Sequence, residues 1–574
     1  MIRLRPRRTA AVLLLLAVAA CGPAPAPPAP VRDSGQPVSA ARGMVVSASA
    51  IASAIGDRVL RDGGNAVDAA VATGFALAVT HPTAGNIGGG GFMVIRFPDG
   101  RSTSFDFREK APLAASPTMF LDSAGVYSNR IHHSSHRAVG VPGAVAGFAL
   151  AHETYGDADW KDLVGPAVEL ADDGFAVPAG LARSLAGAVQ GKLAAYPASV
   201  AAYSKNGTPY AEGETIRLPD LARTLGRIRD RGAAGFYQGE TADLLVAEMR
   251  RGGGIITAED LRRYQAKERA PVRGTYRGYE VISMPPPSSG GIAVIEMLNV
   301  LEGWDLKALG HNSPQHIHYL AEAMRRAFLD RARFVADPDF ADVPVERLLD
   351  KAHAAALRRT IDASRATPSE PIDVDVPGES LETTHYSVVD ADGMAVSVTY
   401  TLEQGYGVGI VVPGAGFLLN NEMGDFNAEP GVTNASGLIG TTPNLARPLQ
   451  RMLSSMTPSI LAKDGELVAV IGSPGGRTII NTVLQVVSNV VDFGMNIQQA
   501  VNAPRLHHQW LPDQISLEAD AVPAATVERL QAMGHTVRMS GRQGTAHSIM
   551  IDPRTRARLG AADPRDADAG AIGH

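Results

Sequence analysis

Apolar and polar residues recur with two different periods in the first part of the chain. Residues 47–61 have the spacing of a helix that stops at a pair of glycines, and Asn65 can cap a second helix of small apolar residues that ends near Thr80. Residues 92–97 and 102–108 alternate as strands do, and a Pro-Asp-Gly turn separates them. The pattern therefore predicts two helices followed by a β-hairpin.

The remainder of the chain divides into a helical middle and a strand-rich end. Residues 143–367 are mostly helical in pattern, and residues 314–335 form the clearest amphipathic segment. After residue 383, short alternating runs predict hairpins around residues 390–393, 413–414 and 463–465. A buried helix over residues 477–493 and a final strand near residue 548 follow. Helices, stacked sheets and more helices predict a layered architecture with largely antiparallel sheets.

The N-terminus has the pattern of an export signal. Four arginines in the first eight residues precede an apolar run, residues 10–20, that is too short to span a bilayer. Val-Ala-Ala then precedes Cys21, the only cysteine, in an arrangement that resembles a bacterial lipobox. We expect a lipoprotein signal peptide over residues 1–20, lipid attachment at Cys21, a proline-rich tether over residues 21–40 and a place on the periplasmic face of a membrane. A plain signal peptide with an incidental cysteine is the alternative interpretation.

Composition excludes some classes of partner. The chain has 574 residues, of which 45% are hydrophobic and 20% charged, an ordinary balance for a globular protein. Its formal net charge of −6 argues against nucleic acid, because phosphate binding needs a basic surface. Neighbouring histidines lack the spacing of metal ligands, so we expect no metal and no other cofactor. These histidines are His132, His133, His136, His311, His316, His318, His507 and His508.

Thr383 opens the strand-rich part of the chain, in the sequence Thr-Thr-His. A threonine hydroxyl needs a nearby base to act as a nucleophile, and a threonine at a chain terminus has one in its own α-amine, with a pKa of about 8. Cleavage between Glu382 and Thr383 would create that amine. The hydroxyl could attack the Glu382 carbonyl and give an ester that water then opens. Taken alone, the motif more often marks a β-branched residue that starts a strand.

Two further groups could complete an acyl-transfer site. The glycine-rich turn at residues 472–476 could direct backbone N–H groups at an oxyanion, although such a turn can also simply join a strand to a helix. Polar residues near the ends of predicted strands could hold an amino-acid zwitterion, because carboxylates bind ammonium groups whereas serines and arginine bind carboxylates. Each charge considered separately is most often a solvated surface residue. The polar residues are Arg108, Glu403, Glu422, Asp425, Ser454 and Ser455.

In this order the motifs resemble the γ-glutamyltransferase (glutathione hydrolase) family of the N-terminal-nucleophile hydrolase superfamily. The resemblance covers nearly the whole chain after the tether. The motifs are "DGGNAVDAA" at 62–70, "GNIGGGGFMVIR" at 85–96, "DFRE" at 106–109, "TTHYSVVD" at 383–390, "LLNNEMGDF" at 418–426, "LSSMTPSI" at 453–460, "GSPGG" at 472–476 and "NAPRLHHQW" at 502–510. The resemblance implies an α+β fold, a four-layer αββα sandwich. It also implies a zymogen that cuts itself into a large subunit, residues 41–382, and a small catalytic subunit, residues 383–574, which stay associated as a heterodimer.

The resemblance also implies a role for each matching residue. Thr383 becomes the nucleophile for processing and turnover, and Thr401 hydrogen-bonds near the new terminus and contacts the substrate. Gly475 and Gly476 supply the oxyanion N–H groups. The γ-glutamyl α-carboxylate is held by Arg108, Ser454 and Ser455, and the α-amine by Glu403, Glu422 and Asp425. Thr383 is then acylated by the γ-glutamyl group of glutathione or a related compound, the amine leaves, and water or an acceptor amino acid or dipeptide takes the acyl group.

Three positions depart from the pattern of some family members, and two other functions stay open. Glu403 and Glu422 are acids where some members have amides, which should still favour an ammonium group. Ser436 stands where some members place a tyrosine latch in a lid, so we expect a looser site. The open alternatives are a β-lactam side-chain (glutaryl/cephalosporin) acylase of the same superfamily and an uncleaved, non-enzymatic binding lipoprotein.

Overall fold

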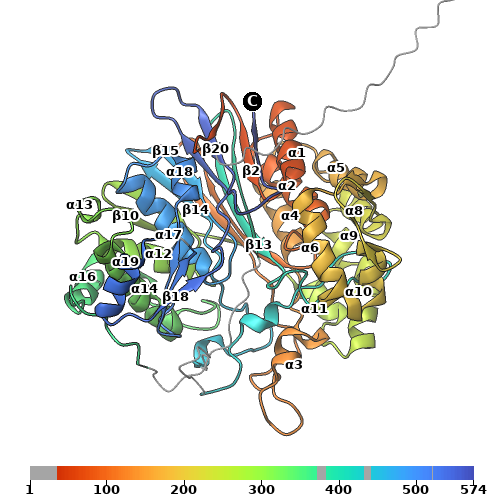
Figure 1. Ribbon diagram of the computed structural model, residues 1–574. Helices are drawn as coiled ribbons and strands as arrows, with labels where there is room; N and C mark the ends of the chain where they lie inside the picture. Colours follow the sequence, from red (N-terminus) through yellow and green to blue (C-terminus); the bar gives the residue numbers. More distant parts are fainter. Residues whose placement is uncertain (1–34, 371–382, 432–440, 520) are drawn as a thin grey trace, which may run out of the picture.

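Two antiparallel sheets lie face to face between two layers of helices (Figure 1). The computed structural model describes residues 35–370, 383–431, 441–519 and 521–574. The first sheet has the order β21 (Gly570–Gly573), β2 (Met44–Ser47), β12 (Thr384–Val389), β13 (Ala395–Thr401), β3 (Gly90–Arg96), β4 (Ser102–Phe107) and β9 (Lys267–Arg269). The second has the order β1 (Val38–Ala40), β20 (Arg558–Ala561), β19 (Ser548–Ile551), β15 (Glu466–Ile471), β14 (Ser459–Lys463), β11 (Tyr279–Ser283) and β10 (Val272–Tyr276). The expected αββα sandwich is confirmed.

Helices of the two layers come from different parts of the chain, as the colours of Figure 1 show. The layer on the first sheet contains α1 (Ala50–Arg61), α2 (Ala66–Thr80), α4 (Ala144–Tyr155), α5 (Trp160–Asp173), α6 (Ala179–Gln190), α8 (Pro219–Arg231), α9 (Ala234–Tyr237), α10 (Glu240–Gly252) and α11 (Ala258–Arg263). The layer on the second sheet contains α12 (Gly290–Leu301), α13 (Leu306–Leu309), α14 (Pro314–Phe334), α16 (Lys351–Arg359), α17 (Thr478–Val491), α18 (Ile497–Asn502) and α19 (Ala524–Ala532). The expected helical middle of the chain therefore contributes to both outer layers.

Shorter elements complete the chain. The remaining helices are α3 (Asn129–His133), α7 (Pro197–Tyr203) and α15 (Val345–Leu349). The remaining strands are β5 (Phe175–Ala176), β6 (Ser204–Lys205), β7 (Thr208–Pro209), β8 (Thr215–Ile216), β16 (Leu506–His507), β17 (Ile515–Glu518) and β18 (Val537–Ser540). No helix among the residues described is long and apolar enough to cross a membrane.

The central strands of the two sheets are buried on both faces, whereas the edge strands β9 and β10 are partly exposed. Phe92 and Val94 of β3 pack between the sheets against Ile460 of β14 and Val470 of β15. The opposite face of the first sheet packs on α2, all of whose residues are buried. Strands β12 and β13 thus lie at the centre of the molecule, where burial holds them rigidly.

Most predicted elements are confirmed, and the exceptions have local causes. Asn65 caps α2 as predicted, and the cap is a reciprocal capping box with Asp68. Residue 47 instead ends β2, and α1 begins after Ser49, whose side chain accepts from Ala52 N–H. The hairpin expected around residues 413–414 is wrong, because this segment forms turns with a single bridge, Val411 to Leu418.

Two predicted boundaries near the ends of the chain are also wrong. β1 lies inside the range expected to be a tether, yet it pairs with β20, so the folded part begins before residue 41. β19 at residue 548 is not the final strand. β20 and β21 follow it and pair with β1 and β2, which brings the C-terminus beside the start of the fold.

Asp390 joins the β12–β13 hairpin to α2. Its Oδ1 accepts hydrogen bonds from the N–H groups of Asp392, Gly393 and Met394, and its Oδ2 accepts from Ala66 N–H at 3.0 Å. The residue is 6% exposed, so none of these N–H groups is easily satisfied by water if the carboxylate is lost.

We therefore expect Asp390→Ala to lower the free energy of unfolding by about 2–4 kcal/mol, since a buried cap and a turn lose their acceptor together. Urea unfolding followed by circular dichroism measures the change. Asp392→Ala is the control, because its side chain is exposed. Equal stability of the two variants would show that the Asp390 bridge contributes little.

Candidate active site

The buried β12–β13 pair positions Thr383. Thr384 pairs with Tyr400, and the same antiparallel register places Thr383 opposite Thr401. The hydroxyls of Tyr386 and Tyr400 donate to carbonyls of α2 at 2.9 Å each, which fixes both strands beneath that helix. Thr383 is 7% exposed. The predicted nucleophile therefore sits at the start of a strand that cannot easily move.

Thr383 borders a narrow polar pocket with an empty volume of about 270 Å³. The pocket brings together most of the residues predicted from the sequence. Its lining consists of Arg108, Thr383, Thr401, Glu403, Glu422, Asp425, Ser454, Ser455, Met456, Gly476 and Ile479. Gly475 is not among the lining residues, but it directly precedes Gly476, which is. Glu382 lies outside the described residues.

The glycine-rich turn joins β15 to α17 beside the pocket. Gly475 and Gly476 have φ angles of 130° and 55°, a region that strongly favours glycine. A Cβ atom on Gly475 would also lie 2.4 Å from the Thr478 hydroxyl oxygen. The carbonyls of the two glycines accept from N–H groups of Thr478 and Ile479 in the first turn of α17. This geometry suits N–H groups that serve an oxyanion, a role that stays a prediction.

Arg108 is fully buried, and its guanidinium contacts the acidic residues of the pocket. Nη1 donates to Glu422, Nη2 donates to Asp425, and further bonds reach the carbonyls of Met452 and Leu453 at 3.3 and 3.2 Å. The sequence assigned Arg108 and these carboxylates to opposite ends of a bound zwitterion. The structure instead places them in direct contact, so a substrate must share or displace this ion pair.

Three carboxylates compete for the single Arg108 cation. Glu109, which the sequence did not single out, has an oxygen 3.6 Å from Arg108 Nη1. Burial raises the pKa of Glu109 to about 8 and the pKa of Glu422 well above its ordinary value, although Arg108 opposes both shifts. The pair therefore retains protons at neutral pH. A protonated Glu422 is neutral and has nearly the shape of glutamine, which explains how an acid can stand where some family members have an amide.

Glu403 is held in a strained conformation at the end of β13. Its φ of 74° is unusual for a residue other than glycine, and its N–H donates to the Thr401 hydroxyl oxygen at 2.8 Å. Its carboxylate accepts from Asn421 Nδ2 and lies 3.7 Å from His133 Nδ1. Burial lowers the pKa of His133 to about 4, so this imidazole is neutral. His133 belongs to helix α3.

A second arginine supports the serines of the pocket. Arg331 on α14 donates to the Ser455 hydroxyl oxygen at 3.0 Å and to the Ser289 hydroxyl oxygen at 2.8 Å. Ser454 is fixed by backbone bonds with Pro287 and Ser289. Arg331 was missed from the sequence. The available signal was a charged residue in the last turn of the amphipathic helix, and the fold buries it to 4% exposure.

Thr383 also borders a larger, more open hollow on its other side. The lining there is rich in charge, with Arg183, Arg542, Arg565, Asp566 and Asp568. The empty volume of this hollow is about 1170 Å³. Thr383 therefore lies between a small pocket and a larger one.

Known proteins match the chain on both sides of Thr383. A family model described as Gamma-glutamyltranspeptidase matches residues 52–573. The glutathione hydrolase proenzyme of Escherichia coli (strain K12) is 48% identical over 538 residues, covering 93% of this chain and 92% of that protein. The crystal structure of a cephalosporin acylase from Bacillus halodurans has a TM-score of 0.84 at 27% identity, over 96% of this chain and 99% of that one. A gamma-glutamyltranspeptidase from Helicobacter pylori is 48% identical, with a TM-score of 0.54 over 55% of this chain and 91% of that one.

The proton on Glu109 makes stability depend on pH. The folded protein holds it up to about pH 8, whereas the unfolded chain releases it near the ordinary value of 4.5. Stability of the wild type therefore falls as pH rises between these values, with a slope of up to about 1.4 kcal/mol per pH unit. Glu109→Gln removes this dependence. We expect the urea midpoint of the variant to rise relative to that of the wild type as pH increases from 5.5 to 8. A difference between the two midpoints that does not change with pH would contradict the raised pKa of Glu109.

Proposed function

The chain belongs to the gamma-glutamyltranspeptidase family, and we propose that it is an autoprocessing enzyme that cleaves γ-glutamyl bonds through an ester on Thr383. Glutathione and related γ-glutamyl compounds are the donors. The single observation that carries this proposal is the position of Thr383, at the start of a buried strand and at the edge of a pocket lined by an arginine, three carboxylates and two serines.

Processing creates the catalyst. Within an uncut chain the nitrogen of Thr383 is an amide and cannot accept a proton. Attack of the Thr383 hydroxyl on the Glu382 carbonyl breaks the peptide bond, frees the α-amine of Thr383 and leaves Glu382 as an ester on the Thr383 oxygen. Water then hydrolyses this ester, which releases the Glu382 carboxylate and restores the Thr383 hydroxyl. The α-amine of Thr383 then serves as the base for the hydroxyl of the same residue. The large and small subunits remain one heterodimer, because each sheet contains strands of both subunits that pair with one another.

Turnover uses the same hydroxyl. The α-ammonium of the γ-glutamyl group binds Glu403 and Asp425, and its α-carboxylate binds Ser454 and Ser455 together with Arg108. This places the γ-carbonyl at Thr383, with the N–H groups of the glycine turn at its developing oxyanion. The amine product leaves, and water or an acceptor amino acid or dipeptide attacks the ester. We assign the leaving amine and the acceptor to the wide hollow, since the narrow pocket is filled by the glutamyl group.

The acylase alternative fits the pocket less well. A glutaryl group has the length of a γ-glutamyl group but lacks its α-amine. Glu403 and Asp425 would then face a substrate that offers them no cation, at a desolvation cost. The carboxylates of the pocket therefore favour a γ-glutamyl donor.

Export and anchoring are part of the proposal. Cys21, the signal peptide and most of the tether lie outside the described residues. The basic start, the short apolar run and the small residues before Cys21 support a lipoprotein at the periplasmic face, with contact to the membrane through the lipid alone.

Hydrolysis of paired substrates tests the proposed function. Purified protein without the lipid anchor is given γ-glutamyl-p-nitroanilide and glutaryl-p-nitroanilide. We expect kcat/KM to favour the γ-glutamyl compound by at least about 100-fold, because one buried charge pair contributes about 3 kcal/mol or more. Thr383→Ala should abolish both reactions, and Thr383→Ser should retain part of the activity. Preference for the glutaryl substrate would make the protein an acylase.

Ser436 governs the expected looseness of the lid, and it lies outside the described residues. A serine side chain is too short to act as the latch that tyrosine provides in some family members. We expect Ser436→Tyr to lower KM for the donor and to change the ratio of transfer to hydrolysis, measured with glycylglycine as acceptor. Unchanged kinetics would show that this position does not control closure.

A further inference from the structure

Three helices of the second outer layer bring two carboxylates and an imidazole together away from Thr383. Glu296 lies on α12, Asp330 on α14 and His353 on α16. The Nε2 atom of His353 is 2.9 Å from Asp330 Oδ2 and 3.5 Å from Glu296 Oε1. The facing atoms of all three residues lie within 4.8 Å of one another. Since the three residues come from separate helices, the sequence spacing of the histidines could not reveal this group.

Two carboxyl groups in this cluster face a single basic side chain. Within the described residues, no arginine or lysine forms an ion pair with Glu296 or Asp330, and His353 is their one titratable basic neighbour. Glu296 is 1% exposed, and its Oε1 has no hydrogen-bond partner among those residues. Buried polar atoms without a partner are uncommon, and this oxygen faces the two other candidate ligands of the cluster.

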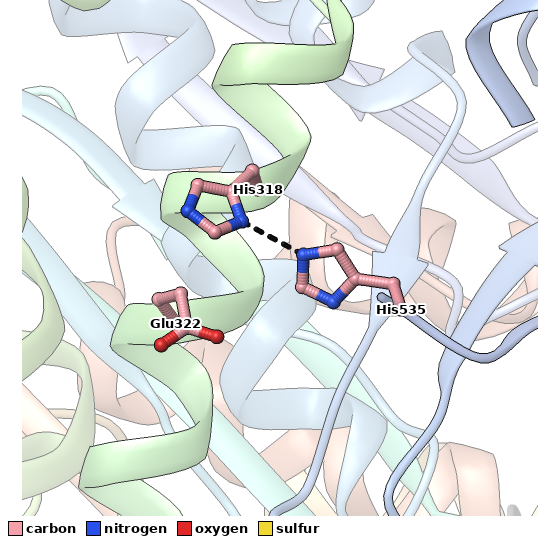
Figure 2. Close-up of side chains that lie close together, drawn as sticks. All are labelled: His318, Glu322 and His535. Atoms are coloured by element: carbon pink, nitrogen blue, oxygen red, sulfur yellow. Dashed lines mark hydrogen bonds between the residues drawn. The ribbon is translucent and has the colours of Figure 1, made fainter. Parts of the chain in front are cut away.

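A comparison cluster on α14 shows the opposite situation (Figure 2). His318 and His535 point at each other and share a hydrogen bond of 2.8 Å, and His318 Nε2 donates to the Asp362 carbonyl. Glu322 lies below them, and it is paired with Arg325 and Arg326. The charge of Glu322 is already balanced, and both nitrogens of His318 and Nε2 of His535 are already hydrogen-bonded. This cluster is a hydrogen-bonded network that ties the end of the large subunit to α14.

We propose that Glu296, Asp330 and His353 form a binding site for a divalent transition-metal ion such as Zn²⁺. Zinc takes one imidazole nitrogen and carboxylate oxygens at about 2.0–2.2 Å, which places tetrahedral ligand atoms about 3.3 Å apart. The observed separations of 2.9 and 3.5 Å lie on either side of that value. The His353 side chain is 17% exposed, which gives the ion an entrance and leaves room for water as a fourth ligand.

The site is structural, because it does not reach the pocket of Thr383. A bound ion would join α12, α14 and α16 at one point. Asp330 directly precedes Arg331, which holds Ser455 and Ser289. Metal binding therefore fixes the helix that supports the substrate serines, and it stabilises the folded protein by mass action.

Titration of metal-free protein with ZnCl₂ tests the proposal. Untagged mature protein is treated with EDTA, dialysed and studied by isothermal titration calorimetry, with Co²⁺ absorption as a direct report of ligation. We expect one equivalent of Zn²⁺ to bind, and excess Zn²⁺ to raise Tm by about 2–5 °C. Glu296→Gln and His353→Gln should each weaken binding at least 10-fold and remove most of the Tm shift.

His535→Gln is the matched control, since glutamine can still donate to His318 and the residue belongs to the comparison cluster. Its Zn²⁺ affinity should equal that of the wild type. Circular dichroism and γ-glutamyl hydrolysis, both measured without added metal, show that each variant is folded. Absence of stoichiometric binding by the wild type would overturn the proposal, as would binding that survives both Glu296→Gln and His353→Gln, or binding that only His535→Gln abolishes.

Discussion

The pairing of β12 with strands on both of its edges is the constraint on which the rest of the structure depends. On one edge lies β2, from the part of the chain before Thr383, and on the other lies β13, from the part after it. Cleavage before Thr383 therefore breaks one peptide bond and leaves the hydrogen bonds of the strand in place. A terminal residue is ordinarily the least ordered part of a chain. Here the first strand of the small subunit is buried in the middle of a sheet, so its terminus can act with the precision of an interior residue.

The electrostatics of the pocket follow from the burial of several carboxyl groups around a single guanidinium. Arg108 is shared by Glu422, Asp425 and Glu109, and burial keeps part of this set protonated. The groups proposed to bind the carboxylate and the ammonium of a zwitterion thus belong to one ion-pair network. In the proposed function, an incoming substrate would exchange its own ammonium and carboxylate groups for contacts that the pocket already makes. Such exchange limits the desolvation cost of binding, since the charges on both sides are paired before and after.

Local sequence patterns were sufficient to predict those features that depend on interactions between neighbouring residues. The cap at Asn65, the β12–β13 hairpin and the strand–glycine–helix turn could all be predicted, because turn and cap chemistry is written in neighbouring residues. The contacts of Arg108 and Arg331 could not be predicted, since Arg108 bonds to Glu422, 314 residues away, and Arg331 bonds to Ser455, 124 residues away. The failed hairpin near residue 413 has the same origin. There Val411 N–H donates to the Ser199 hydroxyl oxygen, a distant partner that no local pattern reveals.

Intact mass spectrometry under denaturing conditions, combined with N-terminal sequencing, tests the central claim most directly. The account predicts that purified protein without its lipid anchor separates into two chains, one of which begins Thr-Thr-His-Tyr. Thr383→Ala should remain a single chain under the same conditions. A wild-type protein that stays whole and yet hydrolyses γ-glutamyl bonds would contradict the account, because its Thr383 would have no α-amine to serve as the base.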